Sequence, residues 1–252
     1  KEGFEVFEPK EEIESVHEFD RESLLSTLKS VRPEVLFIGS FKFQIDKEIL
    51  DSAPIKAVFA RMTAPDCVDL KYCEEKGIEV VKLLGEELGE VVAVPELCIG
   101  KMIELLRMGV PGYELKDKKL GIIGSGRIGR QLGKYAVSLG MWFEPLDKEN
   151  LWNKSYVSSV LSSDIVSLHI TAEESNRNFM DKEKFSLMQN GSYFLNSSRG
   201  WLVEEEALKW ALDNKLAGAW TDFPYGWTHP NLLQTPHIGG STIESSQKTE
   251  SI

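Results

Sequence analysis

The sequence predicts an α/β protein built from two parallel-sheet units, and two observations lead to this prediction. Short runs of β-branched and aromatic residues alternate with helical periods along the chain, a pattern typical of parallel strands covered by helices. An apolar helix over Val94–Arg107 then stops in Met108–Gly112, where a glycine and a proline end it. We therefore place one unit before about residue 95 and a second unit from about 110 to 237.

The predicted strands are short and apolar, as buried parallel strands are. They are Val35–Gly39, Lys56–Ala60, Glu79–Lys82, Lys119–Gly124, Met141–Leu146, Ile165–Ile170, Ser192–Asn196, Gly218–Asp222 and Leu232–Thr235. The predicted helices repeat apolar residues at helical spacing. They are Arg21–Val31, Asp66–Lys76, Val94–Arg107, Arg127–Leu139, Ser155–Ser162, Lys182–Met188 and Glu204–Asp213, with one more beginning in the tail Gly239–Ile252.

Composition and charge exclude several classes of protein. The 252 residues are 42% hydrophobic and 27% charged, as in an ordinary globular protein. The net charge of −11 argues against nucleic acid or a membrane surface as a partner. No apolar run reaches the roughly 18 residues of a membrane span, and no secretion signal opens the chain. Cys67, Cys73 and Cys98 lack the spacing of a metal site, so we expect buried thiols, no metal and a cytoplasmic location.

The segment Lys119–Leu132 joins a predicted strand to an amphipathic helix through the pattern GxGxxG. In this context the pattern predicts a dinucleotide-binding turn. Gly124 allows the tight turn, Gly126 lets the backbone approach a pyrophosphate, and Gly129 lets the helix pack closely on its strand.

Three further residues complete the predicted cofactor contacts of this unit. Arg127 and Ile128 open the helix, where free N–H groups and the helix dipole attract phosphate. Asp147 ends the next strand, 18 residues after Gly129. A carboxylate there accepts hydrogen bonds from the adenosine ribose and repels a 2′-phosphate, which favours NAD over NADP.

Two further motifs, together with the glycine pattern, carry a family resemblance. They are Asn-Ser-Ser-Arg-Gly at Asn196–Gly200 and Thr-Pro-His-Ile-Gly-Gly at Thr235–Gly240. With these motifs the chain resembles the D-isomer-specific 2-hydroxyacid dehydrogenases, and among them the phosphoglycerate dehydrogenases most closely. The matching stretches span nearly the whole chain.

The resemblance implies two doubly wound parallel-sheet domains. A flavodoxin-like substrate domain would cover residues 1–94 and 239–252, and a Rossmann NAD-binding domain would cover residues 95–238. It also implies NAD as cofactor, a small 2-hydroxy or 2-keto acid as substrate, and a homodimer.

The resemblance assigns roles to individual residues. Arg199 would clamp the carboxylate and keto oxygen of the substrate, a task for which a cationic fork is suited. His237 would act as general acid and base, because an imidazole titrates near neutral pH. His169 would shape the loop beside the nicotinamide without reacting, and Ser198 and Asp222 would also contact the cofactor.

One element of the family is missing. Its members have a strand that ends in Asp and, about five residues later, a Glu that orients the catalytic histidine. Aligned on Ala219 and on Phe223–Pro224, the Asp falls on Thr221 and the Glu on Gly226. Asp222 is one residue out of register, so we expect it on the other face of the strand. No acidic residue lies between Asp222 and Glu244.

Other departures concern substrate binding. The glycine of the family's substrate loop falls on Ala64, and the following Pro65 removes a backbone donor. Of the basic contacts that the family's first domain offers to a substrate phosphate, the segment Ser40–Lys42 keeps one lysine, Lys42. Either exposed segments have been omitted from the sequence, or the chain is a shortened member of the family.

Two functional hypotheses therefore remain open. The first is an NAD-dependent oxidoreductase that moves a hydride between nicotinamide and a 2-hydroxy or 2-keto acid, with 3-phosphoglycerate as the first candidate substrate. The second is a dehydrogenase-like regulatory module that binds NAD(H) with lost or weak catalysis, which the missing Glu favours.

Overall fold

The structure is a computed structural model, which describes residues 20–39, 43–62, 65–83 and 92–250. The chain divides into two compact units, Lys1–Gly89 with Lys248–Ile252, and Glu90–Gln247. Within the described residues no helix has the length and apolar character needed to cross a membrane. The predicted residues Lys42 and Ala64 lie outside the described residues.

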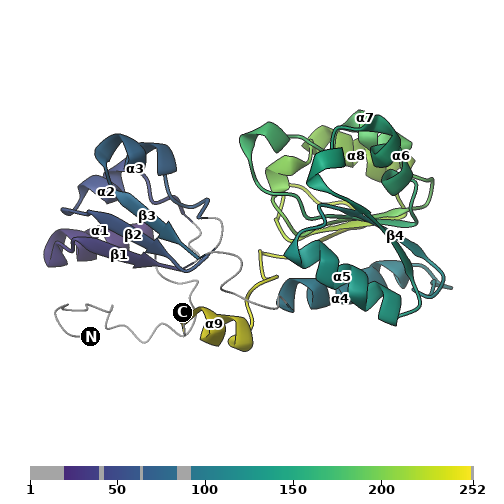
Figure 1. Cartoon of the computed structure of the whole chain (residues 1–252), viewed down its shortest axis with the longest axis horizontal. Coiled ribbons are helices and arrows are strands. Elements are labelled where there is room, and N and C mark those ends of the chain that lie inside the picture. The colour runs from purple at the N-terminus through teal and green to yellow at the C-terminus, as the bar shows by residue number, and fades with distance from the viewer. Residues whose placement is uncertain (1–19, 40–42, 63–64, 84–91, 251–252) are drawn as a thin grey trace. The chain divides into compact units, whose positions relative to one another are not determined.

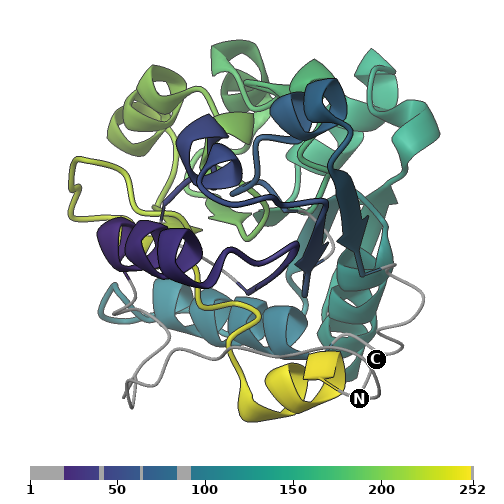
Figure 2. The same ribbon diagram turned by 90° about the vertical axis from the view of Figure 1, so that its left-hand side faces the viewer.

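The first unit contains a three-stranded parallel sheet in the order β1-β2-β3 (Figure 1). Its elements are α1 (Arg21–Val31), β1 (Val35–Ile38), α2 (Lys47–Asp51), β2 (Ala57–Ala60), α3 (Leu70–Lys76) and β3 (Glu79–Lys82). Alternate residues of β1 and β2, such as Ile38 and Val58, are buried in a cluster with apolar residues of all three helices. The opposite face carries Phe37 and Phe59, which are 69% and 36% exposed. Figure 2 shows α1 of this unit in purple.

Aspartates begin the three helices of the first unit. The side chains of Asp20, Asp46 and Asp69 accept hydrogen bonds from the free N–H groups of α1, α2 and α3. The cap at Asp69 starts α3 four residues later than the predicted helix over Asp66–Lys76. The five-residue helix α2 was not predicted, because one turn is too short to show a helical repeat.

The second unit contains a six-stranded parallel sheet in the order β5-β4-β6-β7-β8-β9. The strands are β4 (Lys119–Ile123), β5 (Trp142–Leu146), β6 (Ile165–Leu168), β7 (Tyr193–Asn196), β8 (Gly218–Thr221) and β9 (Leu232–Gln234). The helices are α4 (Ala93–Leu106), α5 (Arg127–Ser138), α6 (Lys154–Leu161), α7 (Lys182–Leu187) and α8 (Glu205–Asn214). A last helix, α9 (Ile243–Glu250), begins in this unit and crosses its boundary after Gln247. Short 3-10 turns lie at Lys148–Asn150, Glu174–Asn176 and Gly200–Leu202.

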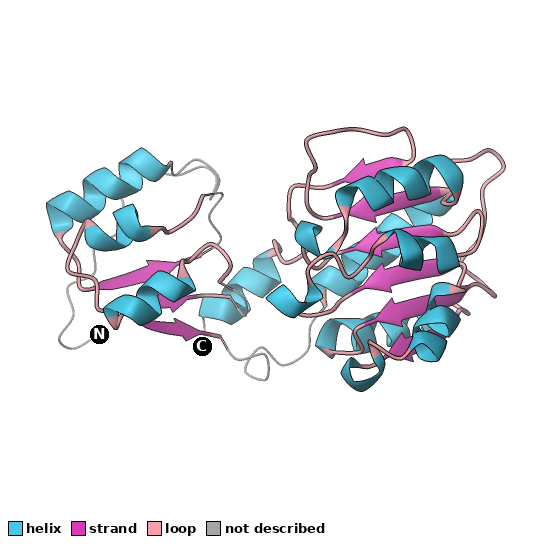
Figure 3. Cartoon of the chain, turned by 90° about the horizontal axis from the view of Figure 1, so that it is seen from above, coloured by secondary structure: helices cyan, strands magenta, loops and turns pink. Residues whose placement is uncertain are grey.

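Helices cover both faces of this second sheet. Helices α4 and α5 pack against each other on one face, and α6, α7 and α8 lie on the other (Figures 1 and 3). Each face has its own buried cluster, one with Ile123 and Phe194, the other with Ile122 and Trp220. The predicted α/β class with parallel sheets is confirmed.

The strand order of the second sheet reverses around β4, because β5 and β6 lie on opposite sides of it. Ligands of such sheets bind beyond the carboxyl ends of the strands at this reversal. The predicted site residues follow the carboxyl ends of β4 to β9, so the fold places them along one edge of the sheet.

Candidate functional site

The glycine-rich turn follows β4 and has the geometry that the motif requires. Gly124 has φ of 97°, and a Cβ there would lie 2.6 Å from the carbonyl carbon of His169. A Cβ at Gly129 would lie 2.3 Å from the carbonyl oxygen of Gly124, so α5 can approach β4 only with glycine there. Gly126 faces open space, since a Cβ added there would meet nothing within 4 Å, and this leaves room for a ligand against the backbone.

The start of α5 offers a cationic group to such a ligand. Gly126 is the N-cap of α5 and supplies no side-chain cap, so the first N–H groups of the helix remain available to a ligand. Nη1 of Arg127 is buried and has no hydrogen-bond partner among the described residues. Burial lowers the pKa of this guanidinium below its usual range. An open cradle beside a guanidinium whose buried Nη1 has no partner among the described residues fits a pyrophosphate.

Asp147 follows β5 directly and is exposed. It is the N-cap of the turn Lys148–Asn150, but its carboxylate makes no capping hydrogen bond. The carboxylate therefore fits the predicted contact with a ribose, at the edge strand next to the glycine turn.

His169 lies just beyond the end of β6, between two serines. Its Nε2 is 2.8 Å from Oγ of Ser167, and its Nδ1 is 3.0 Å from Oγ of Ser197. Burial lowers the pKa of His169 to about 4, so the ring is neutral at physiological pH. The two contacts fit a residue that connects the loops after β6 and β7.

Arg199 lies in a loop after β7 that polar contacts hold in shape. The amide of Asn196 donates to the Arg199 carbonyl oxygen at 2.9 Å, and its oxygen accepts from the Ser198 N–H at 2.9 Å. Oγ of Ser198 donates to the carbonyl oxygen of Leu168 at 3.1 Å. Ser198, predicted to contact the cofactor, therefore also joins this loop to β6.

Asp222 lies just beyond the end of β8 and is 1% exposed. Its Oδ1 accepts hydrogen bonds from Oγ1 of Thr235 at 2.5 Å and from the N–H of Ile238 at 2.9 Å. Its Oδ2 accepts from the N–H of Gly239 at 2.7 Å. Asp222, expected on the face of the strand opposite Thr221, shares a partner with Trp220, because Nε1 of Trp220 also bonds Oγ1 of Thr235. From there its carboxylate binds the segment that carries His237.

The hydrogen bonds to Asp222 stabilise an unusual backbone conformation at His237. Its φ is 58°, in the left-handed region that residues with a Cβ seldom adopt. The next two N–H groups both donate to the Asp222 carboxylate. The imidazole is exposed, so it remains accessible to a ligand.

Phe223 brings the predicted catalytic pair together and was not predicted from the sequence. Its ring centroid is 4.4 Å from that of His237, and the guanidinium carbon of Arg199 lies 5.5 Å from its centre. The one available signal was position, since Arg199, Phe223 and His237 follow the neighbouring parallel strands β7, β8 and β9.

The short segment after Phe223 is held by hydrogen bonds to the Gln234 amide and contains no carboxylate. The N–H of Tyr225 donates to Oε1 of Gln234 at 2.6 Å, and Nε2 of Gln234 donates to the carbonyl oxygen of Trp227 at 2.8 Å. Gly226, the position aligned with the family Glu, is exposed between them.

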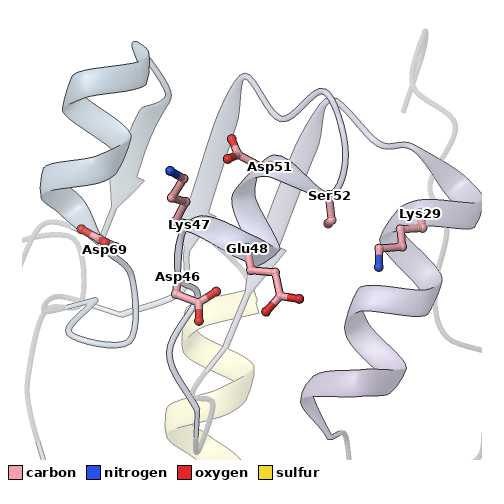
Figure 4. A pocket seen from close by; sticks show the side chains of 7 residues that line it. All are labelled: Lys29, Asp46, Lys47, Glu48, Asp51, Ser52 and Asp69. Carbon is pink, nitrogen blue, oxygen red and sulfur yellow. The ribbon is translucent and has the colours of Figure 1, made fainter.

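A hollow of about 660 Å³ lies in the first unit (Figure 4). It is lined by Lys29, Asp46, Lys47, Glu48, Asp51, Ser52 and Asp69. Its acids are engaged locally: Arg21 pairs with Asp46 and Glu48, and Asp51 accepts from the Tyr72 hydroxyl. The hollow shows no feature that selects a cofactor.

Comparison with known proteins shows the family. The model of the NAD binding domain of D-isomer specific 2-hydroxyacid dehydrogenases matches residues 103–239, more than half of the chain. The chain belongs to this family. The match contains the glycine turn, Arg199 and His237, and it identifies the second unit as the part that binds NAD in this family.

Individual relatives agree with this assignment. D-3-phosphoglycerate dehydrogenase of Escherichia coli is 40% identical over 260 aligned residues, which cover 87% of this chain and 62% of that protein. Hydroxypyruvate reductase of Thermotoga maritima is 28% identical, with 98% of this chain and 91% of that protein covered. The crystal structure of NAD⁺-bound 3-phosphoglycerate dehydrogenase in Entamoeba histolytica has a TM-score of 0.78 at 24% identity, covering 92% of this chain and 79% of that one. The chain thus spans 62% of the length of the Escherichia coli relative.

Proposed function

We propose that the chain is an NAD-dependent oxidoreductase that interconverts a small 2-hydroxy acid and the corresponding 2-keto acid. The observation that carries the proposal is that Arg199 and His237 both contact the ring of Phe223. These residues follow the carboxyl ends of strands in the sheet whose strand β4 precedes the glycine turn. Family membership and the names of the relatives support the same reaction.

The residues that would hold NAD follow β4 and β5, with support from residues that follow β6, β7 and β8. The backbone at Gly126 and the start of α5 would hold the pyrophosphate, and Asp147 the adenosine ribose. When bound, the nicotinamide supplies or accepts the hydride. Ser198, His169 and Asp222 are proposed to support this region. Hydrogen bonds join the loop after β7 to β6 and the loop after it, and join Asp222 after β8 to the segment after β9.

Arg199 and His237 would handle the substrate. The guanidinium binds the carboxylate in two parallel hydrogen bonds and so orients the keto group. The imidazolium of His237 donates a proton to the keto oxygen during reduction, and the neutral ring removes it during oxidation. Because no acid lies between Asp222 and Glu244 to orient the imidazole, we expect turnover roughly 10²-fold below that of members with this Glu.

The test is NADH oxidation with a panel of 2-keto acids, with phosphohydroxypyruvate and hydroxypyruvate first because of the relatives' names. His237→Asn should lower kcat by roughly 10²-fold or more while NADH binding, followed by fluorescence, stays unchanged. His229→Asn is the matched control, since this histidine pairs with Asp213 instead. Proven NADH binding with no reduction of any 2-keto acid in the panel would contradict the proposal.

That negative outcome would favour the second candidate, a regulatory module that binds NAD(H). The supporting observation is the absence of an acid from the segment between Phe223 and Ile243. Size-exclusion chromatography with and without NADH then distinguishes a module whose assembly depends on the nucleotide from a protein that ignores it.

A homodimer in the cytoplasm is part of the same proposal. Large apolar side chains lie exposed on α4 and just after it, among them Ile103 (43%), Met108 (40%) and Tyr113 (58%). Exposed apolar groups of this kind mark contact surfaces. Cys73 and Cys98 are buried thiols, which suits a reducing compartment, and light scattering of the purified protein measures the oligomeric state.

A further inference from the structure

Phe223 contacts both Arg199 and His237, the two catalytic residues of the proposed active site. The imidazole of His237 meets its ring at a centroid distance of 4.4 Å and an angle of 59°. The guanidinium of Arg199 lies over the same ring at 5.5 Å. These contacts join loops that follow three neighbouring strands, so a single side chain sets the spacing of groups that are 38 residues apart in sequence.

The backbone holds Phe223 at this position. Its N–H donates to Oγ1 of Thr221 at 3.2 Å, and the same hydroxyl donates to the Phe223 carbonyl oxygen at 3.3 Å. Asp222, directly before it, is buried and bonded to the segment of His237. A Cβ at Gly200 would lie 3.4 Å from Cβ of Phe223, so the glycine after Arg199 gives the aromatic side chain its space.

The face of an aromatic ring has a negative electrostatic potential, so it attracts a cationic group placed over it. A guanidinium or an imidazolium over a ring gains a cation–π attraction. Two cations that bind the same substrate also repel each other, and a ring in contact with both holds them at a defined spacing. A carboxylate in this segment would form a direct hydrogen bond with the Arg199 guanidinium or the His237 imidazole. The segment from Phe223 to Ile243 contains no carboxylate.

We propose that Phe223 is a positioning residue: its ring holds the Arg199 guanidinium and the His237 imidazole at the spacing that the substrate requires. This inference rests on the proposed function and names one side chain that helps to orient the imidazole. It assigns no chemistry to Phe223 itself.

The contact is tested in the free protein, without turnover. The chain contains His17, His169, His229 and His237, so side-chain NMR of histidine-labelled protein gives four imidazoles, and His237→Asn assigns the relevant one. The ring current of Phe223 should displace the His237 resonances. Phe223→Leu should abolish this displacement, and Phe223→Tyr, which keeps the ring, should retain it. Resonances of His237 that are unchanged in Phe223→Leu would overturn the proposal.

The consequence is tested by turnover of the same variants. Phe223→Leu should lower kcat/KM roughly tenfold, because the cation–π contact with Arg199 and the ring contact with His237 are lost together, while the Kd for NADH stays unchanged. Phe223→Tyr should restore kcat/KM to within about twofold of the parent, since cation–π attraction depends on the ring. Phe143→Leu, on β5, is the matched control for loss of a partly exposed aromatic residue.

Equal kcat/KM in the parent and in Phe223→Leu would contradict a positioning role. If none of the keto acids in the panel supports NADH oxidation by the parent protein, the proposed function fails. The inference about substrate spacing then fails with it. The NMR comparison still tests the positioning contact by itself: a His237 displacement lost in Phe223→Leu and kept in Phe223→Tyr supports that contact, and any other pattern overturns it.

Discussion

The two sheets of the protein are both parallel but bury their residues differently. In β6, β7 and β8 of the second unit every residue is buried. In β1 and β2 of the first unit, buried and exposed residues alternate, and β3 has no buried residue. Parallel sheets are normally covered on both faces, and only the second sheet shows this throughout its central strands.

The difference bears on where the chemistry can reside. A strand packed on both faces holds the loop after it in a definite place, and the loops after β6, β7 and β8 carry His169, Arg199 and Asp222. Catalytic groups need placement of this precision. We expect the second sheet to respond strongly to substitution and the exposed face of the first sheet weakly.

The largest effect is expected in the core of the second unit. Phe194 on β7 is 1% exposed and meets Phe185 edge to face at 5.2 Å. Phe194→Ala should lower the free energy of unfolding by about 3–5 kcal/mol, because the cavity cannot close fully. Urea unfolding followed by circular dichroism measures it, with Phe143→Ala at a 39% exposed position as the control. A loss below about 1 kcal/mol would mean that this sheet is loosely packed.

The next effect is a pH dependence that belongs to the second unit. Burial lowers the pKa of His169 to about 4, below the ordinary value of 6.5. Above pH 6.5 the ring is neutral in both states and stability is complete. As the pH falls from about 6.5 to 4, the unfolded chain binds a proton that the folded protein does not, so stability falls by at most about 3 kcal/mol.

His169→Gln isolates this contribution, because glutamine can bond both serines and does not titrate. In urea unfolding, we expect the parent to exceed this variant in free energy of unfolding by less at pH 4.5 than at pH 7. The described residues of the first unit contain no histidine and have no counterpart to this effect. A difference that is constant with pH would show that the His169 ring is hydrated in the folded protein.

The sequence predicted every strand of both sheets to within two residues at each end, because runs of β-branched and aromatic residues mark buried strands. The glycine turn was equally predictable, since Gly124 and Gly129 have steric reasons and Gly126 leaves the space that a ligand needs. The hydrogen bonds of Asp222 were not predictable, because they join the loop after β8 to Ile238 and Gly239, which meet it only in the folded protein. The contacts of Phe223 depend on three loops that meet only in the folded sheet, and no local pattern encodes them.

The smallest effect is expected on the exposed face of the first sheet. Phe37 and Phe59 stack there at a centroid distance of 5.0 Å, and Phe37 is 69% exposed. Phe37→Ala should cost no more than about 1 kcal/mol, the value of an aromatic pair with little buried area. Leu36→Ala, on the opposite face of β1 and 8% exposed, should cost about 2–5 kcal/mol. If both substitutions cost the same in urea unfolding, both faces of the first sheet are covered in solution, and the contrast with the second sheet disappears.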